Sequence, residues 1–346
     1  MCAMAFMFDG VIINNLTFYL MQPDYICSNE SGQYHCSVQE ACKNLNADVP
    51  EFKVSINWNN GTSLHNWIQD FDLMCAPSYQ IGLIGTTYFL GIVLGNIFLA
   101  RLGDVYGAMP LTRIALVITL VIVFLLMFVV RSLASLYFLL FVFGLFNCWR
   151  AFCPFLYAQE IVLQEDSKLV GSIFLCMTTI PSITYSIYFQ SMSKDWFYAT
   201  LFYFTLLLIA TCISFYLPQS PRFFASKLQF EEAKRSLNFI AKMNRKKQID
   251  PEMEMFTNEL HTVEVEMTRD QDLINEINDF SLGRLLADRV YATNLAIICF
   301  CWCGCMYSFF IITFNMKYFP ANIYSLVIMA CLVEVFAYLI SGTASQ

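Results

Sequence analysis

Three charged side chains stand inside long apolar stretches of this sequence. Asp9, Arg150 and Glu334 fall in the first, fourth and eighth of the apolar runs described below. An ionisable group surrounded by hydrocarbon is expensive, so such residues usually have a function. The two carboxylates could coordinate a cation or take a proton, and Arg150 could be their counter-ion or hold an anion. A purely structural buried pair is the alternative interpretation.

The composition indicates which elements position these residues. Of the 346 residues, 58% are hydrophobic and 14% are charged, against roughly 25% charged in soluble domains. Such a chain cannot surround its core with a polar shell. A helix crosses a bilayer with about 20 mostly apolar residues. Eight runs fit that length, at 3–22, 81–100, 112–130, 136–158, 169–190, 197–217, 293–315 and 323–342. We therefore predict an all-α polytopic membrane protein, with the lipid bilayer as a partner.

The first run is the weakest, since it contains Asp9 and the polar pair Asn14-Asn15. A cleaved signal peptide is the rival interpretation. The segment lacks a basic n-region, and no small-residue cleavage site follows its apolar stretch. A membrane span is therefore favoured.

The Lys/Arg bias of the loops predicts the orientation, because cytoplasmic loops carry an excess of these residues. With the N-terminus inside, the inner positions near the runs are Arg101, Arg113, Lys168, Arg222, Lys227, Lys234, Arg235, Arg284 and Arg289. The outer positions are only Arg131, Lys194 and Lys317. Both termini are therefore predicted to be cytoplasmic.

The loop 23–78, on the predicted outer face, holds an even number of cysteines: Cys27, Cys36, Cys42 and Cys75. Because the outer compartment is oxidising, two disulfides are expected, with three connectivities open. Free thiols are the alternative. Asn29 and Asn60 begin sequons and are candidate glycosylation sites, whereas the match at Asn15 lies inside a run.

The long polar segment 218–290 is predicted to form two or three amphipathic helices against the cytoplasmic face. Phe230, Ala233, Leu237 and Ile240 have helical spacing, and Glu231 stands four residues before Arg235. Asp250-Pro251 has the pattern of a helix start. The basic run Arg245–Lys247 could touch anionic lipid, although a solvated turn is favoured.

Several motifs follow one another along the chain. Asp70–Cys75 reads DFDLMC, Gly95–Gly107 reads GNIFLARLGDVYG, and Pro218–Arg222 reads PQSPR. Gly144 and Glu160 are sixteen positions apart, and the last run begins at Asn322-Ile323-Tyr324 and contains EVFAY from Glu334. Together they resemble, in order, the motifs of the major facilitator superfamily. The DFDLMC stretch is similar to the signature of its organic cation and anion transporters.

The resemblance implies a latch at the cytoplasmic helix ends. Gly95 would permit close helix contact and Gly107 a turn. Asp104 could accept hydrogen bonds from a helix N-terminus and pair with an arginine, holding the outward-open state. Arg222, after Ser220 and Pro221 of the PQSPR motif, could pair with Glu160 and join two helix ends. Ordinary interfacial charges are the alternative interpretation.

This chain departs from the family pattern in the latch. Val105 stands where the family has arginine, Ala108-Met109 replace a basic pair, and Gln219 replaces glutamate. Arg101, one turn before Asp104, could pair with it instead, and Arg113 is another candidate. We therefore expect a weaker latch than usual.

The resemblance also implies which residues bind substrate. Phe155 aligns with a family aromatic that faces the pathway, with Tyr157 and Tyr307 as neighbours, and Arg150 and Glu334 supply charge. Aromatic faces suit quaternary ammonium groups. Tyr338 stands where the anion branch carries lysine, which favours cations or zwitterions. Ala151, at the position of a family tryptophan, leaves the substrate type open.

The family fold has twelve helices in two six-helix halves, so the resemblance implies an incomplete fold of eight. Residues 1–217 would form the N-terminal half, 218–290 a cytoplasmic helical loop, and 291–346 the first two helices of the C-terminal half. The expected function is transport of a small organic ion by alternating access, at the plasma membrane, with a coupling ion as a further partner. No cofactor and no metal are expected.

Other classes fit less well. The three histidines lie outside the runs, which leaves no catalytic or metal-binding set there, and Cys299, Cys301, Cys303 and Cys305 spread around a helix. An enzyme is therefore not expected, and the net charge of -7 argues against a nucleic-acid partner. A heptahelical receptor remains the alternative class, with an odd span number. A sugar carrier is the alternative within transport.

Overall fold

The computed structural model describes residues 1–29, 32–46, 52–163, 166–227, 229–246, 287–319 and 321–344. The chain divides into two compact units, Met1–Ser236 with Phe314–Gln346, and Leu237–Thr313. The predicted helix start at Asp250-Pro251 and most of the segment 218–290 lie outside the described residues.

The described residues contain seven helical stretches long and apolar enough to span a bilayer, and a bent helix pair makes an eighth. Each overlaps one of the eight predicted runs. They are α1–α2 (Cys2–Ile12 and Leu16–Tyr19), α5 (Ser78–Phe98), α7 (Ala108–Phe128), α8 with η1 and α9 (Leu133–Leu145, Cys148–Phe152 and Cys153–Ile161), α10 (Ser167–Ser191), α11 (Trp196–Ser214), α17 (Arg289–Asn315) and α18 (Ile323–Ala344).

The fourth span is bent, which the apolar run 136–158 did not predict. The bend of 43° separates α8 from the η1–α9 segment, and η1 is a π-helix. Pro154 lies in the first turn of α9. Since proline has no N–H, the carbonyl four residues earlier, that of Arg150, loses its α-helical partner. A local π-helical turn at Arg150 is therefore accounted for by this proline.

Glycines bring α5 and α8 into close contact. A Cβ atom added at Gly91 or Gly95 would collide with backbone atoms of α8, namely Phe141 O and Leu145 O. One added at Gly144 would collide with Tyr88 O of α5. The predicted role of Gly95 in close helix contact agrees with this crossing, which uses three glycines rather than one.

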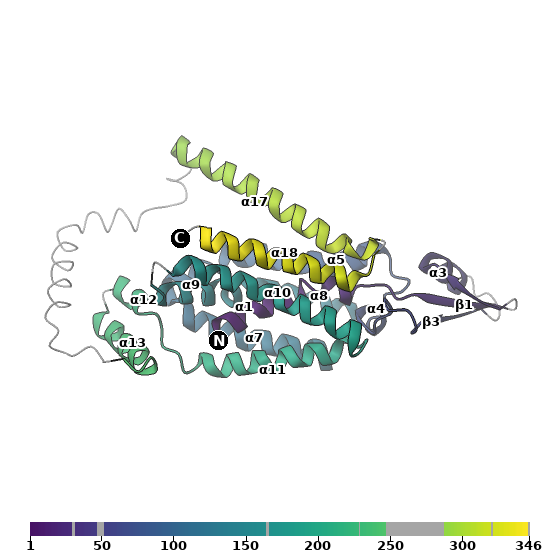
Figure 1. The fold of residues 1–346 in the computed structure, drawn as a ribbon, viewed down its shortest axis with the longest axis horizontal. Coiled ribbons are helices and arrows are strands. Elements are labelled where there is room, and N and C mark those ends of the chain that lie inside the picture. Colours follow the sequence, from purple (N-terminus) through teal and green to yellow (C-terminus); the bar gives the residue numbers. More distant parts are fainter. Residues whose placement is uncertain are drawn as a thin grey trace. The chain divides into compact units, whose positions relative to one another are not determined.

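Helix α18 packs along α10 in the first unit (Figure 1). At one end of α18, the Tyr324 hydroxyl donates to Gly61 O at 2.6 Å. At the other end, Gly342 lies against Ser172, near the start of α10. The first predicted helix of the C-terminal half, α17, belongs almost entirely to the second unit, where its cysteines are free and exposed.

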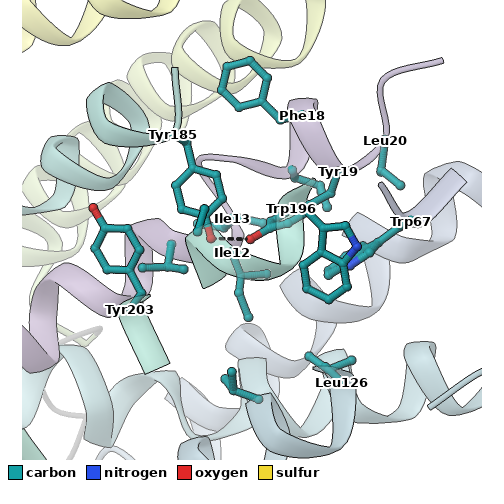
Figure 2. Packing of buried hydrophobic residues seen from close by; sticks show 14 of the residues in the cluster. Ile12, Ile13, Phe18, Tyr19, Leu20, Trp67, Leu126, Tyr185, Trp196 and Tyr203 are labelled. Carbon is teal, nitrogen blue, oxygen red and sulfur yellow. Dashed lines mark hydrogen bonds between the residues drawn. The ribbon is translucent and has the colours of Figure 1, made fainter. Parts of the chain in front are cut away.

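The core of the first unit is rich in aromatic residues (Figure 2). Tyr19 stacks on Trp67 with ring centroids 4.5 Å apart, and Trp196 packs edge-on against both rings. The hydroxyls of Tyr19 and Tyr185 lie 2.9 Å apart, and both are within hydrogen-bonding distance of Thr200 Oγ1. These contacts join α2, α4 (Trp67–Asp70), α10 and α11.

The loop 23–78 forms a small cap at one end of the helices (Figure 1). Its three-stranded antiparallel sheet has the order β2–β1–β3, from Gly32–Cys36, Tyr25–Asn29 and Lys53–Ile56. Helix α3 (Val38–Asn46) packs beside it. Within the first unit, the N-terminus and the C-terminal end of α18 lie at the opposite end of the helices from this sheet (Figure 1).

Two short helices follow the sixth span, α12 (Pro221–Ser226) and α13 (Phe230–Met243). The predicted helical spacing from Phe230 is confirmed by α13. Its ion pair differs from the expected one, because Arg235 contacts Glu232 at 2.7 Å, three residues earlier, rather than Glu231.

Candidate functional site

The charged pair predicted inside the membrane is formed by Asp9 of α1 and Arg150 of η1. Arg150 Nη2 donates to Asp9 Oδ1 at 2.6 Å. The two side chains differ in burial, since Arg150 is 0% exposed and Asp9 is 24% exposed. The carboxylate is therefore the accessible member of the pair.

The rest of the Arg150 guanidinium is fixed by its own helix. Nη1 donates to Phe143 O at 3.1 Å, and Nη2 also reaches Asn147 Oδ1 at 3.3 Å. The guanidinium carbon lies 3.8 Å from the centre of the Phe143 ring, in a cation–π contact. Nε is buried without a hydrogen-bond partner among the described residues. Losing Asp9 would leave a buried cation with only neutral contacts, which is costly.

A tyrosine that the sequence analysis missed completes this group. Tyr88 of α5 donates its hydroxyl to Asp9 Oδ1 at 3.1 Å. The side chain is 2% exposed and packs against Phe143 with centroids 5.6 Å apart. Nothing in its local sequence distinguishes it from the other seventeen of the 18 tyrosines.

Phe155 lies in an aromatic cluster between three helices. Its ring centroid is 6.0 Å from that of Phe6 on α1 and 5.7 Å from that of Phe174 on α10. Tyr157, two residues on, faces elsewhere. It is 3% exposed and donates to Pro218 O at 3.0 Å, so it does not join Phe155 as the sequence analysis expected.

The two other predicted substrate residues, Glu334 and Tyr307, lie on α18 and α17. Glu334 lies half-buried on α18 and forms no ion pair with any described residue. The carboxylate that pairs with Arg150 is therefore that of Asp9. Tyr307 lies on α17, in the second unit, and its side chain is 71% exposed.

The predicted latch ion pairs are not formed in this structure. Asp104 and Arg101 are both exposed, and the described residues contain no ion pair of either. Arg222 is exposed and does not pair with Glu160, whose Oε2 is buried without a described hydrogen-bond partner. Gly107 adopts φ 83°, a conformation that glycine tolerates, and so makes the predicted turn before α7.

Hydrogen bonds from Arg113 join α7 to the C-terminal end of α11 in place of the predicted ion pairs. Arg113 donates to Ser214 O at 3.0 Å and to Leu217 O at 2.5 Å, at the carbonyl end of α11. A cation is favourable there because the helix dipole is negative at its C-terminus. This explains why Arg113 does not pair with Asp104.

The PQSPR segment connects three helices. Gln219 Oε1 accepts from Met109 N at 3.0 Å, in the first turn of α7. Pro218 O accepts from Tyr157 of α9, as described above. Ser220 caps α12 by accepting from Arg222 N at 3.2 Å, with Pro221 at the first helical position. Gln219 was expected to weaken the latch because it replaces a glutamate; in the structure its side chain caps the N-terminus of α7.

The cap contains the two expected disulfides, Cys27–Cys36 and Cys42–Cys75, one of the three connectivities left open. The DFDLMC stretch ends in Cys75 and begins with Asp70, which accepts from Trp196 Nε1 at 2.7 Å. The motif therefore ties the cap to the start of α11 and to the disulfide beside α5.

Asp24 organises the polar part of the cap. Its Oδ2 accepts from Asn57 at 2.9 Å and from Asn60 at 3.2 Å, and lies 3.2 Å from His35 Nδ1. Partial burial acts to raise the pKa of Asp24, but the two amides and His35 outweigh it, so the pKa is lowered. Asn60 is half-buried and Asn29 lies in β1, and glycosylation at both stays a prediction.

Comparisons with known proteins identify the family of this chain. A sequence model of the Major Facilitator Superfamily matches residues 48–346. Organic cation transporter 1 of Caenorhabditis elegans is 25% identical over 199 residues, which are 56% of this chain and 33% of that protein. The chain therefore spans about a third of the length of this relative.

Two solved structures of the xylose transporter XylE are also similar. The proton:xylose symporter bound to 6-bromo-6-deoxy-D-glucose aligns at TM-score 0.42 and 13% identity, over 68% of this chain and 49% of its own. The partially occluded inward-open form from E. coli aligns at TM-score 0.47 and 11% identity, over 99% of this chain and 86% of its own.

The long apolar helices define a multi-pass membrane protein. Since the family match covers most of the sequence, the chain belongs to the Major Facilitator Superfamily. Members of this family are transporters rather than enzymes.

Proposed function

We propose that this protein carries small organic ions, with cations or zwitterions favoured, across the plasma membrane by alternating access. The observation that carries this proposal is the Asp9–Arg150 pair, in which the anion is accessible and the cation is fully buried. A partly open carboxylate backed by a fixed positive charge can exchange its partner for a proton or for a cationic group of the solute. The half-buried Glu334 supplies a second acid in the membrane.

The aromatic residues near Asp9 support a cationic or zwitterionic solute. Phe155, Phe6 and Phe174 form a cluster on α1, α9 and α10, and α1 also carries Asp9. Aromatic faces attract quaternary and protonated amines. The name of the nematode relative, an organic cation transporter, points to the same class. Tyr307 and Glu334 stay proposed contributors from the C-terminal half.

The proposed orientation puts the cap outside and both termini in the cytoplasm. Two disulfides in the cap are expected only in an oxidising compartment. Residues 1–217 would then form one half of the carrier and 291–346 the beginning of the other. The helix ends held by Gln219 and Arg113 would form the cytoplasmic latch, which changes partners when the halves rock.

Uptake by cells that express the chain tests this proposal. Labelled tetraethylammonium, an organic anion such as p-aminohippurate, and 2-deoxyglucose are compared at equal surface expression. We expect uptake of the cation only, and its loss in Asp9→Asn. Asp72→Asn is the matched control, because Asp72 is exposed in the cap and its φ of 52° is tolerated by asparagine. Uptake of the hexose or of the anion alone would overturn the proposed substrate class.

A further inference from the structure

The carboxylate of Asp9 is held unevenly. Oδ1 accepts two hydrogen bonds, from Arg150 Nη2 and from the Tyr88 hydroxyl. Oδ2 accepts none from the residues that the structure describes. An ionised carboxylate offers about four lone-pair positions, two on each oxygen. Those of Oδ1 are filled, and those of Oδ2 are open.

The two donors to Oδ1 come from different helices and are themselves fixed. Tyr88 lies on α5 and Arg150 on η1, and both side chains contact the ring of Phe143. The backbone of Tyr88 is fixed by the glycine crossing, since its carbonyl lies against Gly144. Because packing allows the Tyr88 hydroxyl little movement, it sets the plane and rotation of the carboxylate on α1.

We propose that Tyr88 is a positioning residue: together with Arg150 it saturates Oδ1, and so makes Oδ2 the one oxygen of Asp9 that receives a proton or a single N–H of a cationic solute. What arrives at Oδ2 rests on the proposed function. The occupancy of Oδ1 does not, because it follows from contacts within the first unit. The rival is that Tyr88 merely satisfies its own hydroxyl by bonding to the nearest acceptor.

Labelling with N,N′-dicyclohexylcarbodiimide separates these two roles. This reagent enters membranes and adds to protonated carboxyl groups, and mass spectrometry of the peptide that contains Asp9 measures the rate. Removing one donor from the ionised form favours protonation. We expect Tyr88→Phe to raise the labelling rate of Asp9 about tenfold, the loss typical of a hydrogen bond to a charged group.

Tyr137→Phe is the matched control. Its hydroxyl links α8 to α5 by donating to Gln80 O at 2.7 Å, so the variant also removes a hydrogen bond of α5, but one that does not involve Asp9. We expect wild-type labelling of Asp9 in this variant. Glu334 is the internal reference, and its labelling should be the same in all variants. Asp9→Asn identifies the labelled residue, because it removes the signal.

Replacing Tyr88 with 4-aminophenylalanine distinguishes loss of the hydrogen bond from loosened packing. This residue keeps the ring and an N–H donor, so it should restore slow labelling. The proposal is overturned if Tyr88→Phe labels Asp9 at the wild-type rate, or if Tyr137→Phe accelerates labelling equally. No transport is measured, so a failure here differs from a failure of the proposed function, which the uptake assay reports.

Discussion

The glycine crossing between α5 and α8 gives the sharpest test of this fold. Gly91→Ala adds one methyl group at a place where the new Cβ would meet Leu145 N at 2.8 Å and Gly144 C at 3.1 Å, besides colliding with Phe141 O. All three neighbours are backbone atoms, so no side-chain rotation can relieve the contact. The helices must separate instead.

Gly82→Ala is the control on the same helix. A Cβ at Gly82 meets nothing within 4 Å. Both substitutions gain the same helical preference of alanine over glycine, about 0.5–1 kcal/mol. The difference between the two variants therefore isolates the steric cost at Gly91, about 1–3 kcal/mol for an overpacked site.

Thermal unfolding in detergent, followed as the fraction of monodisperse protein left after heating, measures this difference. At about 1–2 °C per kcal/mol for a chain of this length, Gly91→Ala should unfold a few degrees below Gly82→Ala. Gly144→Ala should resemble Gly91→Ala. Because both residues belong to one crossing, the double variant should lose less than the sum of the two losses. Equal midpoints for Gly91→Ala and Gly82→Ala would refute the close crossing.

Three further outcomes concern the cap and the opposite end of the bundle. The pKa of Asp24 is lowered, so its contribution to cap stability is complete above the ordinary carboxyl pKa of about 3.9 and is lost as the pH falls through the lower folded value. Asp24→Asn should remove this acid sensitivity in tryptophan-fluorescence titrations, and an unchanged acid limb would contradict it. Cys42→Ser should destabilise the cap more than Cys27→Ser, because the disulfides close separations of 33 and 9 residues; the chain-entropy costs are about 4 and about 3 kcal/mol. Denaturant titration measures both, and the reverse order would argue against this account. Gln219→Leu should lower the thermal midpoint, because it removes the hydrogen bond that caps the N-terminus of α7, which contributes about 1 kcal/mol. Gln229→Leu, at an exposed position, should leave the midpoint unchanged. Equal midpoints for the two variants would show that this helix-capping hydrogen bond contributes nothing.

The spans could be predicted because crossing a bilayer depends on the composition of about 20 residues, and the run Ile114–Val130 meets that requirement without a charge. The bend in the fourth span could not be predicted by the same count, which does not register the hydrogen bond lost at Pro154. The disulfide partner of Cys27 also depends on the folded sheet. Strands β1 and β2 are antiparallel, and Cys27 lies opposite Tyr34, two residues before its partner Cys36.

The candidate site was predictable in its charges and not in its contacts. An acid and a base in apolar runs indicate a pair, and Asp9 and Arg150 form one. Asp104 and Arg222 were expected to pair because of their motifs at the helix ends, but neither forms an ion pair with a described residue, because exposed charges gain little from pairing. The role of Tyr88 could not be predicted from the sequence, because it depends on which helix packs beside α1 and on which residue of that helix lies level with Asp9.

The glycine crossing and the ion pair are physically linked. Arg150 follows the bend after α8, and Tyr88 stands one turn before Gly91 on α5, so the crossing sets the separation of the two donors that meet at Asp9. Moving α5 away from α8 by the width of one methyl group would lengthen at least one of these hydrogen bonds. Hydrogen bonds weaken steeply with distance and misalignment. Gly144→Ala should therefore raise the carbodiimide labelling of Asp9 as Tyr88→Phe does, although it removes no polar atom. Gly82→Ala, on the same helix, should leave the labelling unchanged.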